Sequence, residues 1–198
     1  KKRPDRYLAE AIAALELLQK RAPLNSKSYS RLADIYLKIG APEKALPNLI
    51  YLHRHSMNDQ KYARQIAEIY RSMDRMDMAL KFFMEVIYTN PFEVNAYESI
   101  ASILVRQGQF RDAVATAEQM TLIDPRSPRV HSYNAKILYR AGKAARDVSI
   151  LEKARNEVLK ALELGSPPAE VKRIQHYIDA TLKRLKAGAE TNGHERKT

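Results

Sequence analysis

A short pattern recurs along the chain, first as SYSRLADIYLKIG at residues 28–40 and then as YARQIAEIYRSMD at residues 62–74. Two further copies follow, AYESIASILVRQG at 96–108 and RVHSYNAKILYRAG at 129–142. Each copy has an alanine at one equivalent position, and consecutive members are 34 residues apart: Ala33, Ala67, Ala101 and Ala135. A fixed period of this size indicates a structural unit that stacks on copies of itself. The sequence therefore predicts a repeat array.

Other positions recur in phase with these alanines. A bulky residue follows three places later, at Tyr36, Tyr70, Leu104 and Leu138. Seven places later stands a residue at which we expect a helix to stop and the chain to turn, namely Gly40, Asp74, Gly108 or Gly142. A second small residue comes twelve places later in three copies, at Ala45, Ala79 and Ala113. Each copy thus predicts two antiparallel helices that approach closely where the small residues meet.

This combination of period and residue types resembles the tetratricopeptide repeat, a 34-residue helix–turn–helix unit. The resemblance implies an all-α fold, an α-α superhelix of antiparallel helix pairs with about ten helices.

The same pattern divides residues 1–186 as a single array. We expect the second helix of a truncated upstream repeat at 5–25, a capping helix at 167–186 and a tail or linker at 187–198. The full repeats are predicted at 26–59, 60–93 and 94–127, followed by an irregular repeat at 128–166. In that last repeat the small-residue pattern slips by seven residues, to Ala154, which predicts an inserted turn or a longer second helix at 143–149. Pro47 falls inside a predicted second helix, so we expect that helix to begin late or to kink.

The composition excludes several classes of function. The 198 residues contain no Cys, which excludes disulfide frameworks and thiolate metal sites, and no apolar run is long enough to span a membrane. No phosphate-binding glycine loop, nucleophile elbow or metalloprotease motif is present, and His53 and His55 point to different sides of a helix. We therefore expect no enzyme activity, no cofactor and no metal.

The charge is informative, because 34 Lys and Arg residues against 23 Asp and Glu give a formal charge of +11. The resemblance implies that the first helix of each pair lines a concave groove. Of the 24 groove positions implied in this way, ten are Lys or Arg and three are Asp or Glu. We expect partner contacts from Lys27, Arg31, Lys38, Lys61, Arg64, Arg71, Arg106, Arg129, Tyr133, Lys136, Tyr139 and Arg140.

These observations favour a non-catalytic scaffold for protein–protein interaction. Its basic groove would bind an acidic peptide or partner protein, or another domain of the same chain, as part of a larger multidomain protein. The alternative is binding of nucleic acid or another anionic surface through the same groove. Interleaved acidic residues, Asp34, Glu68 and Glu98, weaken that alternative. The sequence does not identify a compartment, and a soluble, cytoplasmic protein is the working expectation.

Overall fold

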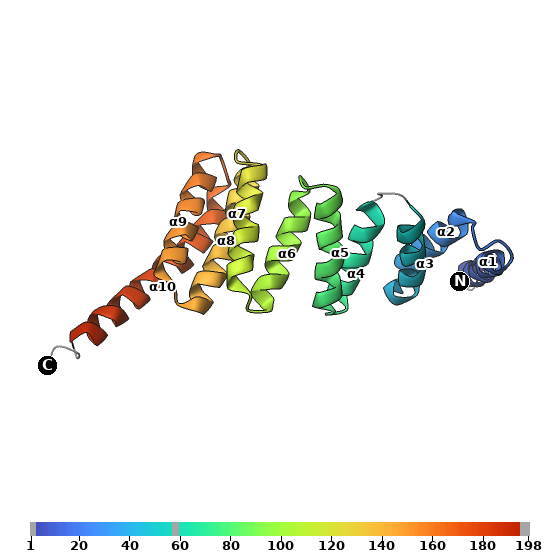
Figure 1. Cartoon of the computed structure of the whole chain (residues 1–198), viewed down its shortest axis with the longest axis horizontal. Coiled ribbons are helices and arrows are strands. Elements are labelled where there is room, and N and C mark those ends of the chain that lie inside the picture. The colour runs from blue at the N-terminus through green and yellow to red at the C-terminus, as the bar shows by residue number, and fades with distance from the viewer. Residues whose placement is uncertain (1–2, 57–59, 195–198) are drawn as a thin grey trace. The chain divides into compact units, whose positions relative to one another are not determined.

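The computed structural model describes residues 3–56 and 60–194, and within these residues it contains α-helices and no strands (Figure 1). The helices are α1 (Arg3–Arg21), α2 (Ser26–Lys38), α3 (Pro42–His55), α4 (Gln60–Ser72), α5 (Met76–Thr89), α6 (Val94–Arg106), α7 (Phe110–Ile123), α8 (Pro128–Ala145), α9 (Val148–Glu163) and α10 (Pro168–His194). The predicted all-α class and helix-pair architecture are confirmed. Parts of the predicted repeat 26–59 and of the predicted tail 187–198 lie outside the described residues.

The helices form two compact units, Lys1–Pro91 with α1 to α5 and Phe92–Thr198 with α6 to α10. In the first unit α2 pairs with α3 and α4 with α5, while α1 packs against α2. In the second unit α6 pairs with α7 and α8 with α9, and Figure 1 shows these four helices side by side. Contacts between α6 and α8, and between α8 and α10, link successive leading helices of this unit along one face.

The recurring alanines are where the helices of a pair meet. Ala33, Ala67, Ala101 and Ala135 are at most 1% exposed, and the second set, Ala45, Ala79 and Ala113, is fully buried. A methyl group lets two helix backbones come close without leaving a void, so the 34-residue spacing in the sequence places a small buried residue in each helix pair.

Three of the four predicted turn residues end a helix in the left-handed conformation. Gly40 and Gly108 have φ of +72° and +75°, and Asp74 has φ of +59°. Gly tolerates this region without cost, and Asp tolerates it better than most residues.

The prediction that Gly142 ends its helix is wrong. α8 continues to Ala145, and the left-handed residue is Arg146, with φ of +53°. Gly142 is buried inside the helix because α9 crosses it closely. A Cβ atom at position 142 would lie 2.9 Å from the Leu151 Cγ atom. The seven additional residues of this repeat therefore lie mainly in a longer first helix, α8, which has 18 residues. The predicted inserted turn or longer second helix does not account for most of them.

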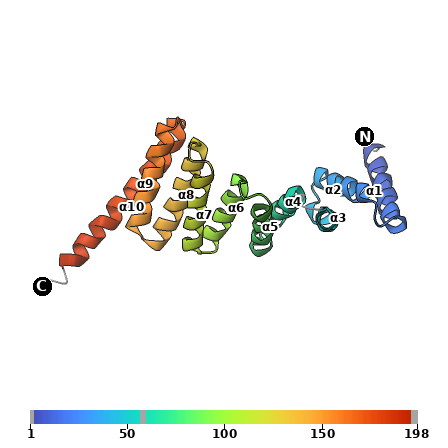
Figure 2. The same cartoon turned by 45° about the horizontal axis from the view of Figure 1, so that its top comes forward.

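Two helix boundaries also differ from expectation. α3 begins at Pro42 and runs through Pro47, so the expected late start is wrong, and the alternative expectation of a kink stays a prediction. Pro42 occupies the first turn, where a missing N–H costs nothing, and the Pro47 ring faces outward on an exposed side. The last helix does not end near Lys186 but extends to His194. Figure 2 shows α10 running past the end of α9.

Candidate peptide-binding face

The helix α8 is the best-defined part of the predicted binding face. Ser127 caps its start by accepting a hydrogen bond from the Val130 backbone N–H, and Pro128 supplies the first-turn φ. One side of α8 is fully buried and packs on α9 through Ala135 and Leu138. The opposite side carries Arg129, Tyr133 and Lys136, all predicted site residues.

Two of these side chains, Arg129 and Tyr133, meet α6, the leading helix of the preceding pair. The Arg129 Nη1 atom lies 2.9 Å from Glu98 Oε1, and its Nη2 atom donates to Asn95 Oδ1 at 2.9 Å. The Tyr133 hydroxyl donates to the Glu98 backbone carbonyl at 2.8 Å. The predicted grouping of leading-helix residues is therefore present within the second unit. Glu98, expected only as an interruption of the positive charge, is in fact the anchor of the group.

Burial and nearby cations have opposite effects on the pKa of Glu98. Its side chain is only 14% exposed. Burial raises the pKa of the Glu98 carboxyl above its usual range, while Arg129 and, more weakly, Lys136 pull this pKa back down. The carboxylate thus fixes Arg129 beside the adjacent cleft and lies within the electrostatic reach of Lys136.

A cleft of about 200 Å³ opens on this side of α8, against the turn between α9 and α10. Its lining residues are Pro128, Arg129, Ser132, Tyr133, Lys136, Gly165, Ser166 and Pro167. The Ser166 hydroxyl donates to the Pro128 carbonyl at 3.2 Å. The Ser132 hydroxyl lies 2.9 Å from the Ser166 hydroxyl. Because these buried hydroxyls bond to each other and to the backbone, Arg129 and Lys136 are the groups that would attract an anion.

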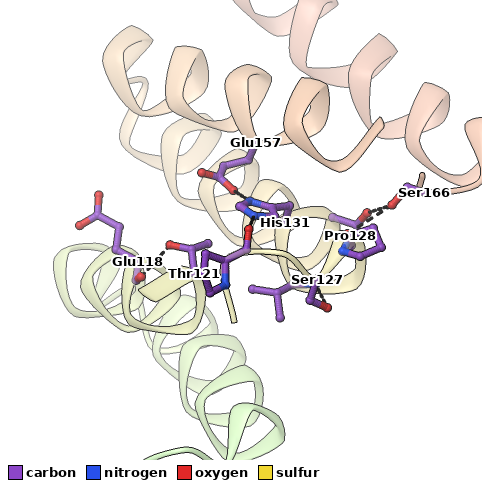
Figure 3. A network of polar contacts seen from close by, with 10 residues as sticks. Glu118, Thr121, Ser127, Pro128, His131, Glu157 and Ser166 are labelled. Atoms are coloured by element: carbon purple, nitrogen blue, oxygen red, sulfur yellow. Dashed lines mark hydrogen bonds and ion pairs between the residues drawn. The ribbon is translucent and has the colours of Figure 1, made fainter. Parts of the chain in front are cut away.

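A buried histidine fixes α8 from behind. His131 is 1% exposed, and its Nδ1 and Nε2 atoms lie 2.6 Å from Glu157 Oε2 and 2.9 Å from the Pro125 carbonyl. Figure 3 shows the ring directed at Glu157 on α9. The carbonyl can only accept, so Nε2 carries a hydrogen, and a further proton must lie between Nδ1 and the carboxyl group. The contact joins α8, α9 and the turn before α8, and so sets the orientation of the binding face.

The other predicted residues of the second unit are less concentrated. The Tyr139 ring stacks on Tyr177 of α10 with centroids 6.4 Å apart, and the Lys143 amine lies over it at 5.8 Å. Arg106 and Arg140 are exposed near the ends of their helices. Tyr139 therefore belongs to the contact between α8 and α10, and Arg140 is the predicted residue that extends the basic surface of α8.

In the first unit the predicted residues fall into two groups. Arg31 and Lys38 line a groove between α1 and α2, together with Asp34. On α4, Arg71 forms an ion pair with Glu68 and lies over the Phe83 ring at 6.0 Å. The cations Lys27 and Lys61 are exposed and Arg64 is half-buried. The convergence of all twelve predicted residues on one groove remains a prediction, because they are divided between the two units.

The repeat pattern did not predict the part of the cleft that comes from the turn between α9 and α10. Gly165, Ser166 and Pro167 follow the phase slip, so the repeat pattern did not assign them to the same face as α8. One signal was available, because Ser166 is 34 residues after Ser132 and the two hydroxyls meet. The period therefore persists on this face, although the helices between the two serines are longer.

The described residues hold no group of three or more His, Cys, Asp or Glu side chains that could bind a metal ion. His53 instead pairs with Glu85 at 2.8 Å, beside a polar cavity of about 250 Å³. Among the described helices, none is both long and apolar enough to cross a membrane.

Comparison with known families and proteins gives one family match. Residues 65–93 match the model of the tetratricopeptide repeat. The sequence matches none of the curated proteins with which it was compared.

Several solved structures are similar over most of the chain. MamA from Desulfovibrio magneticus RS-1 has a TM-score of 0.65 and 20% identity, and the match covers 87% of this chain and 93% of that one. The C-terminal part of a repeat-containing protein from Cytophaga hutchinsonii has a TM-score of 0.69 and 17% identity, covering 91% and 69% of the two chains. YrrB, described as having an unusual peptide-binding site, has a TM-score of 0.63 and 16% identity, covering 87% and 86%. At these identities the similarity establishes the fold.

Proposed function

Because the chain is a tetratricopeptide-like repeat domain, we propose that it is a non-catalytic scaffold that binds an acidic segment of a partner protein. The proposal places the principal contact on α8 in the second unit. It is supported most directly by one observation, the position of Arg129 and Lys136 at a cleft of about 200 Å³.

The size of the cleft favours a peptide over a small free ligand. Pockets that hold small-molecule ligands usually measure about 300–1,000 Å³. The smaller cleft suits one acidic side chain, with the rest of the peptide lying along α8 toward Arg140. Positive charge on this face would raise the association rate of an acidic segment and disfavour basic ones.

Not every cation on this face is free to engage a partner. Arg129 already bonds with Glu98 and Asn95, so its main role is to hold a positive potential at the cleft. Lys136 lies near the same carboxylate but stays half-buried at the cleft wall, and Arg140 is exposed one turn further along α8. Charge reversal at Lys136 and Arg140 therefore removes positive charge from this face and leaves Arg129, with its contacts to Glu98 and Asn95, in place.

The test is a binding titration by fluorescence anisotropy with a labelled twelve-residue peptide of Glu and Leu, and with a matched peptide that has Gln in place of every Glu. We expect the Glu peptide to bind in a salt-dependent manner, and the double variant K136E/R140E to bind about tenfold or more weakly. The matched control is R111E/K160E, which makes the same change of charge on the outer helices α7 and α9.

Equal binding of both peptides, or equal loss of affinity in both double variants, would contradict the proposal. A labelled single-stranded RNA that binds more tightly than the Glu peptide, with a steeper dependence on salt, would favour the nucleic-acid alternative. Circular dichroism of each variant checks that its helix content is unchanged.

A further inference from the structure

Helix α10 carries an exposed aromatic ring beside α8. Tyr177 is 49% exposed, and its ring stacks on Tyr139 of α8 with centroids 6.4 Å apart and an angle of 20° between the ring planes. Among the described side chains of the leading helices α6, α8 and α10, no other large apolar residue is exposed. A tyrosine ring that is held by one neighbour and half-exposed to solvent is typical of anchor residues at protein interfaces.

The contacts of α10 show which of its sides faces α8. Asp179 lies 3.4 Å from the Arg155 Nε atom, and the Lys186 amine donates to Glu152 Oε1 at 2.8 Å, so this side of α10 meets α9. Tyr177 precedes Asp179 by two residues, and two residues along an α-helix point to nearly opposite sides. The exposed ring therefore borders a surface between two leading helices, α8 and α10, which the structure describes on both sides.

On α8, cations accompany the ring on which Tyr177 stacks. The Lys143 amine lies 5.8 Å from the centre of the Tyr139 ring. Arg140 is exposed and follows Tyr139 directly, and Lys136, which lines the cleft, precedes Tyr139 by three residues. These three cations follow one another at spacings of four and three residues, so they lie in one row along α8. The row leads from the cleft to the aromatic pair.

On α10, two arginines share the side of Tyr177. Arg173 is four residues before Tyr177 and Arg184 is seven residues after it, and these spacings return to the same face of a helix. Both arginines are exposed, and among the described residues no ion pair or hydrogen bond engages either side chain. An anionic segment that crosses this surface would therefore meet positive charge on both helices, because Asp179 is turned toward α9.

From these observations we propose that Tyr139 and Tyr177 form a second subsite of the α8 binding face, which takes an aromatic side chain of the acidic partner segment. This inference rests on the proposed function, because it requires a carboxylate of the same segment in the cleft beside Lys136. It narrows the partner from any acidic segment to one in which acidic residues flank a Phe, Tyr or Trp.

The separation of the two subsites sets the spacing within the partner. Ser132 lines the cleft and is seven residues before Tyr139. At about 1.5 Å per residue, this corresponds to about 10 Å along α8. A segment in the polyproline II conformation advances about 3.1 Å per residue and repeats its side-chain direction every third residue. The carboxylate and the aromatic ring should therefore be three residues apart in the partner.

The same surface is less suited to single-stranded nucleic acid. Proteins that bind it without sequence preference stack successive bases on several aromatic side chains. Here Tyr177 is one half-exposed ring, while Tyr139 is covered in part by Tyr177 and by the Lys143 amine. One stacking position instead suits one aromatic residue of a peptide.

The test compares three fluorescein-labelled peptides of twelve residues by anisotropy. The first contains Ser, one central Phe, and a Glu at the third residue on either side of the Phe. The second has Ala in place of the Phe, and the third keeps the Phe but has Gln in place of each Glu. We expect the full chain to bind the Phe peptide about tenfold more tightly than the Ala peptide, and the Gln peptide more weakly than the Phe peptide.

Two variants locate the aromatic subsite. Y177A removes the exposed ring, and we expect it to bind the Phe and Ala peptides with equal affinity. L159A is the matched control, because Leu159 is an exposed apolar residue of the outer helix α9 in the same unit, and it should keep the tenfold preference. The preference is a ratio measured on one variant, so a partial loss of folded protein leaves it unchanged.

Equal binding of the Phe and Ala peptides to the parent chain, or a preference for Phe that persists in Y177A, would overturn the second subsite. If the Ala peptide nevertheless binds and loses affinity in K136E/R140E, the proposed function stands without this subsite. If none of the peptides binds, both proposals fail. A labelled single-stranded RNA that binds more tightly than the Phe peptide, and that loses affinity in Y177A, would show that the ring stacks on a base and would also overturn the inference.

Discussion

Removal of the Glu157 carboxylate is expected to loosen α8 and α9 while leaving the first unit unchanged. The substitution E157A deprives the buried His131 Nδ1 atom of its partner at 2.6 Å. The Nε2 atom keeps its bond to the Pro125 carbonyl at 2.9 Å. One ring nitrogen is thus left without a partner in a side chain that is 1% exposed.

The magnitude follows from the two partners' burial. Leaving a buried polar group without its hydrogen bond costs about 1–3 kcal/mol. The Glu157 side chain is 21% exposed, so water can reach the space and replace part of the lost bond. We therefore expect E157A to destabilise the α8–α9 pair by about 2 kcal/mol, which corresponds to about a 30-fold change in the opening equilibrium. E157Q should cost less than E157A, because the Gln amide can donate to Nδ1 of a neutral ring.

Hydrogen exchange measured by mass spectrometry is the appropriate assay, because it resolves opening of individual helices. Amides of α8 and α9 should exchange about 30-fold faster in E157A, while those of α2 to α5 should not change. The matched control is E152A on the same helix, which removes a surface ion pair with Lys186 and should cost less than about 1 kcal/mol. If E157A and E152A accelerated exchange equally, the assigned role of His131 would be refuted.

Three further predictions concern single side chains of the second unit. G142A should destabilise by about 1–3 kcal/mol in urea unfolding, because its Cβ would lie 2.9 Å from Leu151; a gain in stability, as expected for Gly to Ala in an open helix, would contradict this contact. R146G should raise the melting temperature, since φ of +53° strains any residue with a Cβ, and an unchanged or lower value would show that no strain is stored there. R129Q should raise the Glu98 pKa further, and carbon-13 NMR can follow this pKa. A carboxyl with a raised pKa binds its proton more tightly in the folded state, so the free energy of unfolding of this variant should increase as the pH falls through that pKa. An unchanged Glu98 pKa in R129Q would contradict the ion pair.

The sequence predicts the fold well because the repeat is set by local rules. Small residues at one phase and turn residues at another determine where helices cross and end. These rules apply where Gly40 and Gly108 adopt positive φ. These rules fail at Gly142. A glycine can end a helix with a positive φ, or it can allow a second helix to cross closely, and only the position of α9 shows that Gly142 does the latter.

The candidate site was predictable in part. The leading-helix positions of α8 follow from the period, and Arg129, Tyr133 and Lys136 do lie together. The side of the cleft formed by Gly165, Ser166 and Pro167 was not predictable. Ser166 follows two lengthened helices, α8 and α9, and reaches the site because the chain turns back between α9 and α10. The buried carboxylate of Glu98 was missed for a related reason. A charge count treats an acidic residue as subtracting from a basic surface, whereas in the structure it positions the cations.

NMR mapping of the residues that contact the acidic Glu and Leu peptide directly tests whether α8 and the adjacent turn form the binding site. Backbone amide shifts are followed in the nitrogen-15-labelled chain during titration. We expect the shifts to concentrate at Arg129, Lys136 and the turn at Gly165 and Ser166, with saturation at the same peptide concentration for each. Shifts confined to the outer helices α7 and α9, or weak shifts spread over every exposed lysine and arginine, would contradict this binding site.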